Sequence, residues 1–179
     1  MDREITPELI DKVFYLITDH NDSTSNAILP IMIDKIFGKR DFSLINHLLT
    51  KNLRPYEKSQ ILYLAHKDGL YDIIKKIFEL GISDESKNDF FYSILTDSKK
   101  LKDQLLNFVL SFGIDDLNKL RYAIYKSDLQ YISQVKDSTL IDKVIRYAID
   151  IHNTEAIRIM LPYLSKNVIA DIIQIQYNS

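Results

Sequence analysis

The four histidines are the first side chains to consider for metal binding or acid–base chemistry. No two of them stand three or four residues apart, and neither His-Glu-x-x-His nor His-x-His occurs. A zinc site needs three or four donors that converge on one point. We therefore expect no metal ligand and no metal cofactor, and we interpret the histidines as surface or turn residues: His20, His47, His66 and His152.

The segment after the first predicted helix carries part of a calcium-loop pattern. Asp19, Asn21 and Ser23 stand where the first, third and fifth ligands of such a loop would be. Thr24 replaces the glycine that the sharp turn requires, and Pro30 replaces the bidentate glutamate. The calcium pattern therefore fails, and residues 21–26 are expected to form a polar loop.

Patterns for covalent or cofactor chemistry are also absent from the sequence. It has no cysteine, no Gly-x-Ser-x-Gly elbow and four glycines, which leaves few for a phosphate-binding or dinucleotide-binding loop. The adjacent carboxylates Asp115 and Asp116 are better explained by a helix start, with Asp116 as the N-cap. The sequence predicts a non-enzymatic protein without catalytic residues or cofactors.

The charge distribution gives no indication of a nucleic-acid partner. The formal net charge is -2, and the small basic clusters Lys75–Lys76 and Lys99–Lys100 have acidic neighbours. No apolar stretch approaches the 18 or so residues that span a bilayer, and the charged N-terminus lacks the apolar region of a signal peptide. We expect an intracellular, cytoplasmic protein with no membrane partner.

Hydrophobic residues recur with helical spacing almost throughout the chain. Pairs of neighbouring apolar residues repeat four positions later, which places them on one helical face. No strict alternation over six residues and no Asn-Gly or Asp-Gly hairpin signal occurs. The sequence therefore predicts an all-α fold of about ten or eleven short helices. The clearest of these faces are Leu44–Leu49, Ile73–Phe78, Leu105–Leu110 and Ala156–Leu161.

An internal repeat underlies these helices. Shifts of 29 and 32 residues superpose the second-helix patterns around residues 44–52, 73–81 and 109–113. The segments 121–124 and 146–149 are identical, Arg-Tyr-Ala-Ile, at a spacing of 25. The unit is a first helix with a small central residue (Ala65, Ala123, Ala148), a tight turn and an apolar second helix. Repeats of 20–50 residues are typical of stacked helical arrays.

The segment from Ser59 to Ile82 resembles an ankyrin repeat. Residues 62–65 (Leu-Tyr-Leu-Ala) stand at the family's Leu-His-x-Ala, Asp68–Gly69 at its Asn-Gly turn and residues 80–82 at its closing x-Gly-Ala. The resemblance extends more weakly from about residue 27 to residue 167. The Thr-Pro cap is replaced by Ser59–Gln60, and the spacing of 25 leaves too few residues for β-hairpin fingers. Divergent arrays of this type, from AT-rich genomes such as those of large DNA viruses, also share the chain's richness in Ile, Lys, Asp and Asn.

The resemblance implies a solenoid of stacked antiparallel helix pairs in a single domain, 1–179. Residues 1–26 would form an N-terminal capping helix and loop, 27–165 about five helix pairs, and 166–179 a C-terminal helix. An array of HEAT or tetratricopeptide type is the next alternative for the fold. A single globular bundle, such as the Bcl-2-like fold, is the third.

Tyrosine and arginine residues on the first helices are the candidates for binding a partner. Arg121 and Arg146 stand at the histidine position of the ankyrin Thr-Pro-Leu-His pattern, and Tyr63 lies on the best repeat. Tyrosine and arginine often dominate binding energy at interfaces. They also pack between repeats, so both interpretations remain open. The candidate partner-binding residues are Tyr63, His66, Arg121, Tyr125 and Arg146.

The expected function is protein–protein interaction through the repeat surface, with a protein partner that the sequence does not identify. The alternatives are a host-modulating Bcl-2-like bundle, and an enzyme or nucleic-acid effector whose site converges only in three dimensions. The C-terminal helix is very apolar for a cap. This gives the further hypothesis of a homodimer formed through that helix.

Overall fold

The computed structural model describes the backbone of residues 4–20, 23–97 and 102–177 and the side chains of 4–17, 27–97 and 102–174. Within these residues the chain is all-α, with twelve α-helices, one short 3-10 helix and no strand. The predicted all-α fold is therefore confirmed. The contacts divide the chain into two compact units, Met1–Ser86 and Lys87–Ser179.

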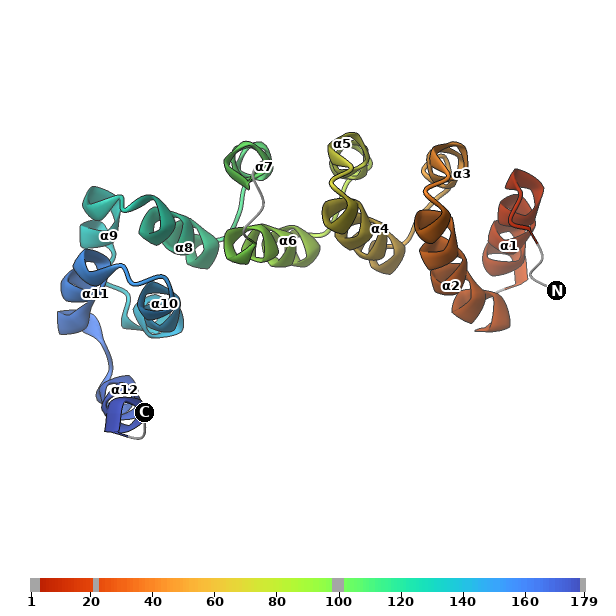
Figure 1. The fold of residues 1–179 in the computed structure, drawn as a ribbon. Coiled ribbons are helices and arrows are strands. Elements are labelled where there is room, and N and C mark those ends of the chain that lie inside the picture. Colours follow the sequence, from red (N-terminus) through yellow and green to blue (C-terminus); the bar gives the residue numbers. More distant parts are fainter. Residues whose placement is uncertain (1–3, 21–22, 98–101, 178–179) are drawn as a thin grey trace. The chain divides into compact units, whose positions relative to one another are not determined.

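The first unit contains five helices and the start of a sixth. Helices α2 and α4 lie side by side, and α3 and α5 form a second layer on them, while α1 packs on α2 and α3 (Figure 1). Thr6 accepts a hydrogen bond from the Leu9 N–H, so it caps α1, and Pro7 stands in the first turn of that helix. The helices are α1 (Pro7–His20), α2 (Ser23–Lys39), α3 (Phe42–Leu48), α4 (Pro55–Asp68), α5 (Tyr71–Glu79) and α6 (Asp84–Thr96).

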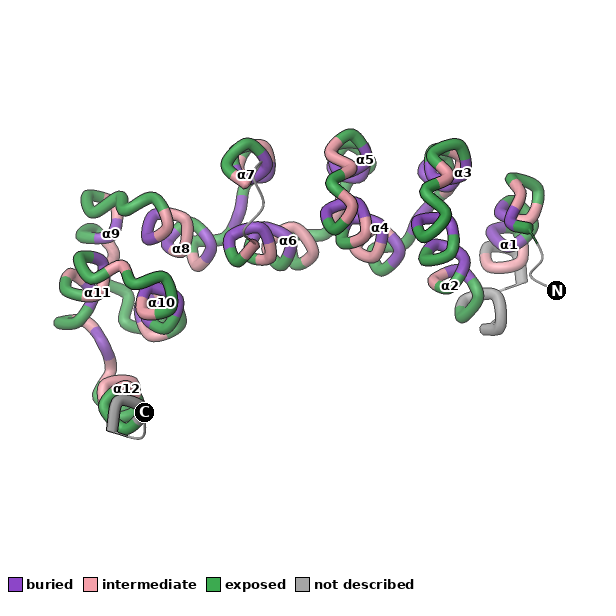
Figure 2. Tube along the Cα trace, in the orientation of Figure 1, coloured by how far each residue is buried: buried purple, intermediate pink, exposed green. Residues whose placement is uncertain are grey.

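The second unit repeats the same pairing. Helices α8 and α10 pack against each other, α9 packs on α11, and each pair is also in contact internally (Figure 1). The predicted C-terminal helix is present, although none of its described residues is buried (Figure 2). The elements are α7 (Lys102–Leu110), α8 (Asp116–Lys126), α9 (Leu129–Gln134), α10 (Ser138–Asp150), α11 (Thr154–Met160), η1 (Leu161–Tyr163) and α12 (Lys166–Tyr177).

Four of the helix pairs are joined by the same turn. One residue adopts a left-handed conformation, and the next residue donates its N–H to the carbonyl five positions earlier, as in a Schellman motif. That residue also stands at the N-cap position of the second helix. The turns are Arg40–Asp41, Gly69–Leu70, Ser127–Asp128 and His152–Asn153, and their acceptors are Ile36, Ala65, Ala123 and Ala148. The three alanines of the sequence repeat are therefore buried residues one turn before this motif.

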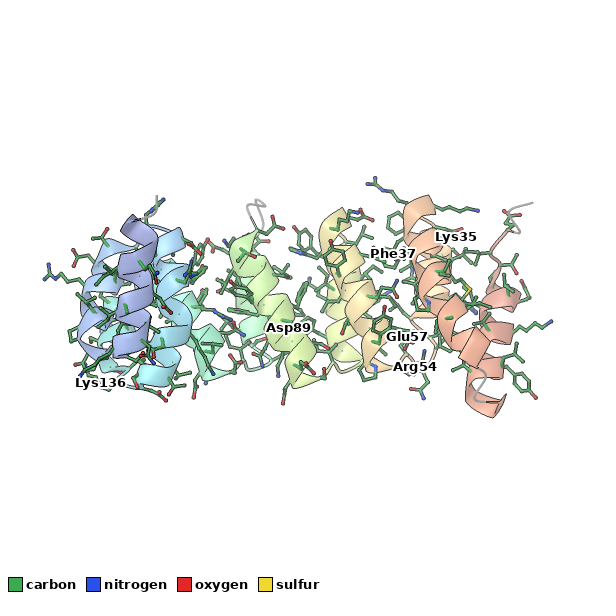
Figure 3. The ribbon with its side chains drawn as sticks, turned by 90° about the horizontal axis from the view of Figure 1, so that it is seen from below. Lys35, Phe37, Arg54, Glu57, Asp89 and Lys136 are labelled. Atoms are coloured by element: carbon green, nitrogen blue, oxygen red, sulfur yellow. The ribbon has the colours of Figure 1, made fainter. Side chains whose placement is uncertain are left out.

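Several local predictions need correction. Helix α2 begins at Ser23, so the expected polar loop over 21–26 is shorter, and residues 21–22 lie outside the described part. Asp115, rather than Asp116, is the N-cap of α8, because its carboxylate accepts the Asn118 N–H at 2.7 Å. Helix α4 starts with a capping box: the Glu57 carboxylate lies beside Arg54 and accepts its backbone N–H at 2.8 Å (Figure 3).

Candidate partner-binding surface

Buried residues at equivalent positions set the register of the first helices. Ile36, Ala65, Ile94, Ala123 and Ala148 are each at most 5% exposed and follow one another at spacings of 29, 29, 29 and 25 residues. The residue two positions before each of them lies on another face of its helix, since consecutive helical residues are about 100° apart. We name this set the outer row: Asp34, Tyr63, Tyr92, Arg121 and Arg146. Three of the five predicted binding residues belong to it.

In the first unit, the outer row presents an exposed aromatic side chain. Tyr63 is 64% exposed, and Tyr56, two turns earlier on α4, is 65% exposed. Gln60 lies between them and holds α4 to α2, because its amide donates to the Pro30 carbonyl at 3.0 Å and to the Asp34 carboxylate at 2.9 Å. The structure therefore places Tyr63 where a partner can reach it.

His66 does not share this position. It is 8% exposed and lies on the buried side of α4, at the register of Ile124 and Ile149. It is therefore not on the face that presents Tyr63. The expected surface position is therefore wrong for His66, whereas His152 is a turn residue as expected, at the left-handed position that corresponds to Gly69.

In the second unit, Arg121 is held in a fixed position on the outer row. Its guanidinium carbon lies 4.0 Å from the centroid of the Tyr92 ring, and its Nη1 donates to the Asn118 amide oxygen at 3.0 Å. Asn118 is 2% exposed and donates its own amide to the Asn88 carbonyl at 3.1 Å. This bond spans 30 residues, as does that from Gln60 to Pro30, so the same amide link joins neighbouring first helices in both units.

Arg121 has no carboxylate partner within 4.0 Å among the described residues, and its buried Nε has no hydrogen-bond acceptor there. The stacked ring supplies cation–π attraction but leaves the positive charge uncompensated. Arg121 is half-buried, and its charge has no carboxylate partner among the described residues.

Tyr147 completes this cluster and was missed by sequence reasoning. Its ring meets Tyr92 edge to face at 6.4 Å between centroids, and its residue is 6% exposed. The hydroxyl has no hydrogen-bond partner among the described residues. The pKa of Tyr147 is raised to about 12, mainly by burial and to a smaller extent by the nearby Tyr125 and Tyr92, while Arg121 lowers this pKa. The sequence feature that could have identified Tyr147 is the Arg-Tyr-Ala-Ile repeat, because it places Tyr122 and Tyr147 at the same register.

Tyr125 lies within a network of internal contacts. Its hydroxyl donates to the Asp103 carboxylate at 3.2 Å, and the Lys102 ammonium lies 4.3 Å from its ring centroid. Lys126 forms an ion pair with the same carboxylate at 2.9 Å, and the pKa of Asp103 is lowered mainly by this bond. For Tyr125 the structure therefore favours packing between helices over an open binding position.

Arg146 is exposed and has no ion pair within 4.0 Å among the described residues. It lies at the edge of a cavity of about 540 Å³ between α10, α11 and α12. Its lining includes the apolar residues Ile145, Ile149 and Ile172. Arg121 and Arg146 thus occupy one register on adjacent, packed helices.

No group of three His, Asp or Glu side chains that suits a metal ion occurs in the described part of the chain. His47 instead lies 2.7 Å from the Asp11 carboxylate, which also pairs with Lys51 at 2.5 Å, and these contacts lower the pKa of Asp11. The side chain of His20 lies outside the described residues. Within the described residues, no helix has the length and apolar character needed to cross a membrane.

The comparisons with known proteins add no relative. No family model, no curated protein and no solved structure matches the chain. Any functional argument therefore depends on the chain's own residues.

Proposed function

We propose that the chain is a non-enzymatic protein-interaction module that binds a protein partner through the outer row of its first helices. The observation that carries this proposal is Arg121, which is fixed by Tyr92 and Asn118 and has no carboxylate partner. The Tyr92 ring and Asn118 order this half-buried side chain but do not neutralise its charge, which leaves a partner's anion a favourable interaction to make. Arginine and tyrosine are also the side chains that most often dominate binding energy.

The repeated turn supports an array in preference to a single bundle. Four helix pairs share one Schellman-type turn, and two interhelix amide bonds span the same 30 residues. We propose that the pairs form an ankyrin-like solenoid in one domain, a fold that offers an extended binding surface. An intracellular, cytoplasmic protein of a large DNA virus that acts on a host protein is the setting we propose for it.

The test is capture of a partner from the source cells with matched variants of the outer row. The bait carries Tyr63→Ala, Arg121→Ala and Arg146→Ala together, and the control carries Lys75→Ala, Glu79→Ala and Arg158→Ala on second helices. We expect one protein to be enriched by the wild type and the control and lost with the outer-row variant. Its purified form must then bind the wild-type chain directly. Equal binding by both variants would remove the outer row as the binding face.

A further inference from the structure

The charges of the second unit indicate which kind of partner the outer row suits. Arg121 and Arg146 present two cations at one register on adjacent helices, and neither has an ion pair among the described residues. We propose that this pair binds an extended acidic segment of a protein partner, with two carboxylates in an Asp/Glu-x-Asp/Glu arrangement. The inference rests on the proposed interaction function and names the chemistry of the partner.

Arg121 is prepared for a carboxylate in particular. The Tyr92 ring lies against its guanidinium plane at 4.0 Å, and Asn118 takes one of its N–H groups. The N–H groups of a guanidinium lie in one plane, and two of them on one edge match the two oxygens of a carboxylate. Because the stack already fixes the side chain, binding costs less rotamer entropy than it does for a mobile arginine.

The spacing of the two arginines fits an extended peptide. Packed helices have axes about 8–10 Å apart. Alternate side chains of an extended strand point to the same side and stand about 7 Å apart. Arg146 is exposed and unstacked, so its long side chain can accommodate the remaining difference.

Nearby acidic residues form no ion pair with either arginine. Asp142 and Asp150 lie one turn from Arg146 on α10, and Asp89 lies one turn before Tyr92 on α6, but none comes within 4.0 Å of either guanidinium. The Asp142 carboxylate accepts the Ser165 N–H at 3.0 Å. A continuous polyanion would lie against these carboxylates and be repelled by them. A short acidic motif can contact both arginines without running along the carboxylates, so the acids favour the short motif.

The overall charge also separates a peptide from a nucleic acid. Residues 87–179 contain twelve Lys or Arg and eleven Asp or Glu residues, so this unit has almost no net charge. Binding to a phosphate backbone depends on a broad basic surface and on the counterions it releases. Two localised guanidiniums, one of them stacked on a tyrosine ring, suit a carboxylate motif better than a phosphate backbone.

The probe is a fluorescein-labelled peptide, Gly-Ser-Glu-Ser-Glu-Ser-Gly, with Gln in place of Glu as its control. Anisotropy titrations of the full chain measure the dissociation constant at low and at physiological salt. Arg121→Gln and Arg146→Gln are each expected to weaken binding about tenfold, because each removes a charge-assisted hydrogen bond. Arg158→Gln, which removes the same charge from an 80% exposed side chain on α11, is expected to change it less than about twofold.

Three results would overturn the acidic-segment proposal. They are equal binding of the Gln peptide, equal loss with Arg158→Gln, and tighter binding of a single-stranded oligonucleotide that displaces the peptide. Arg146→Gln keeps the test valid if Arg121→Gln does not fold, because Arg146 makes no side-chain hydrogen bond or ion pair with the described residues. If the peptide fails while partner capture still depends on the outer row, the interaction function stands and only the acidic motif is refuted.

Discussion

Replacing Tyr147 by phenylalanine tests the description of the cluster around Arg121. The hydroxyl is buried and has no hydrogen-bond partner among the described residues. A hydroxyl left unpaired in the interior costs about 1–3 kcal/mol. The ring and its contact with Tyr92 remain in the variant. We therefore expect Tyr147→Phe to raise the free energy of unfolding by about 1 kcal/mol, with a rise in Tm of about 2–4 °C for a chain of this size.

The same substitution has a pH signature. The pKa of Tyr147 is about 12 in the folded chain, against about 10 for an unperturbed tyrosine. Because the unfolded chain releases this proton first, the wild type loses stability as the pH rises from about 10 to about 12. By pH 11 the loss amounts to about 1 kcal/mol. The variant lacks this contribution, so its advantage over the wild type is expected to grow to about 2 kcal/mol at pH 11.

Urea unfolding followed by circular dichroism, at pH 7 and at pH 11, measures both effects. Tyr122→Phe is the matched control, because Tyr122 occupies the same register one repeat earlier but donates its hydroxyl to the Asn107 side-chain oxygen at 3.0 Å. This control is expected to lose about 0.5 kcal/mol. A Tyr147→Phe variant that is less stable than the wild type at pH 7 would refute the unpaired hydroxyl. It would mean that a group such as an ordered water satisfies it.

Three further predictions concern the turns, the interhelix amides and the last helix. Ser127→Gly and His152→Gly each place a glycine at a left-handed position and remove the steric cost of a side chain there. Each is expected to raise the free energy of unfolding by about 1 kcal/mol, measured by urea unfolding. An unchanged free energy of unfolding would contradict the shared turn. Asn118→Ala removes a buried amide bonded to Asn88 and Arg121, so we expect a loss of about 1–3 kcal/mol in the same assay and weaker binding of the Glu peptide. For the hypothesis of a homodimer, the relevant residue is Ile173, which is 50% exposed on α12. Light scattering is expected to give a dimeric mass for the wild type and a monomeric mass for Ile173→Asp. A monomeric wild type at high micromolar concentration would reject the dimer.

The sequence was sufficient for the fold class and for part of the repeat. Helical spacing predicts the α-helices, and the alanines at 65, 123 and 148 mark buried positions that the structure confirms. Ile94 completes the spacing of 29 but was not recognised, because a large residue there hides the small-residue pattern. The left-handed turns at Ser127 and His152 were equally hidden, since only glycine signals that conformation in a sequence.

The candidate surface was only partly predictable. The repeat predicts that Tyr63, Arg121 and Arg146 share a register, but burial decides which neighbours join them. Tyr125 differs from Tyr63 because contacts from α7 take up its side chain, and His66 differs because it is buried. The α7 contacts come from residues 20 or more positions away, and a periodicity analysis of one helix does not contain them.

The change of spacing from 29 to 25 residues indicates where the fold tolerates variation. Helix α9 has six residues where α5 has nine, which accounts for three of the four missing residues. The segment before the next first helix is also one residue shorter, 135–137 in place of 80–83. The two-residue turn is unchanged, and both α6 and α10 begin ten residues before the buried residue that sets the register. The shortening therefore falls in the second helix and its linker, so that the first helices keep Arg121 and Arg146 at one register.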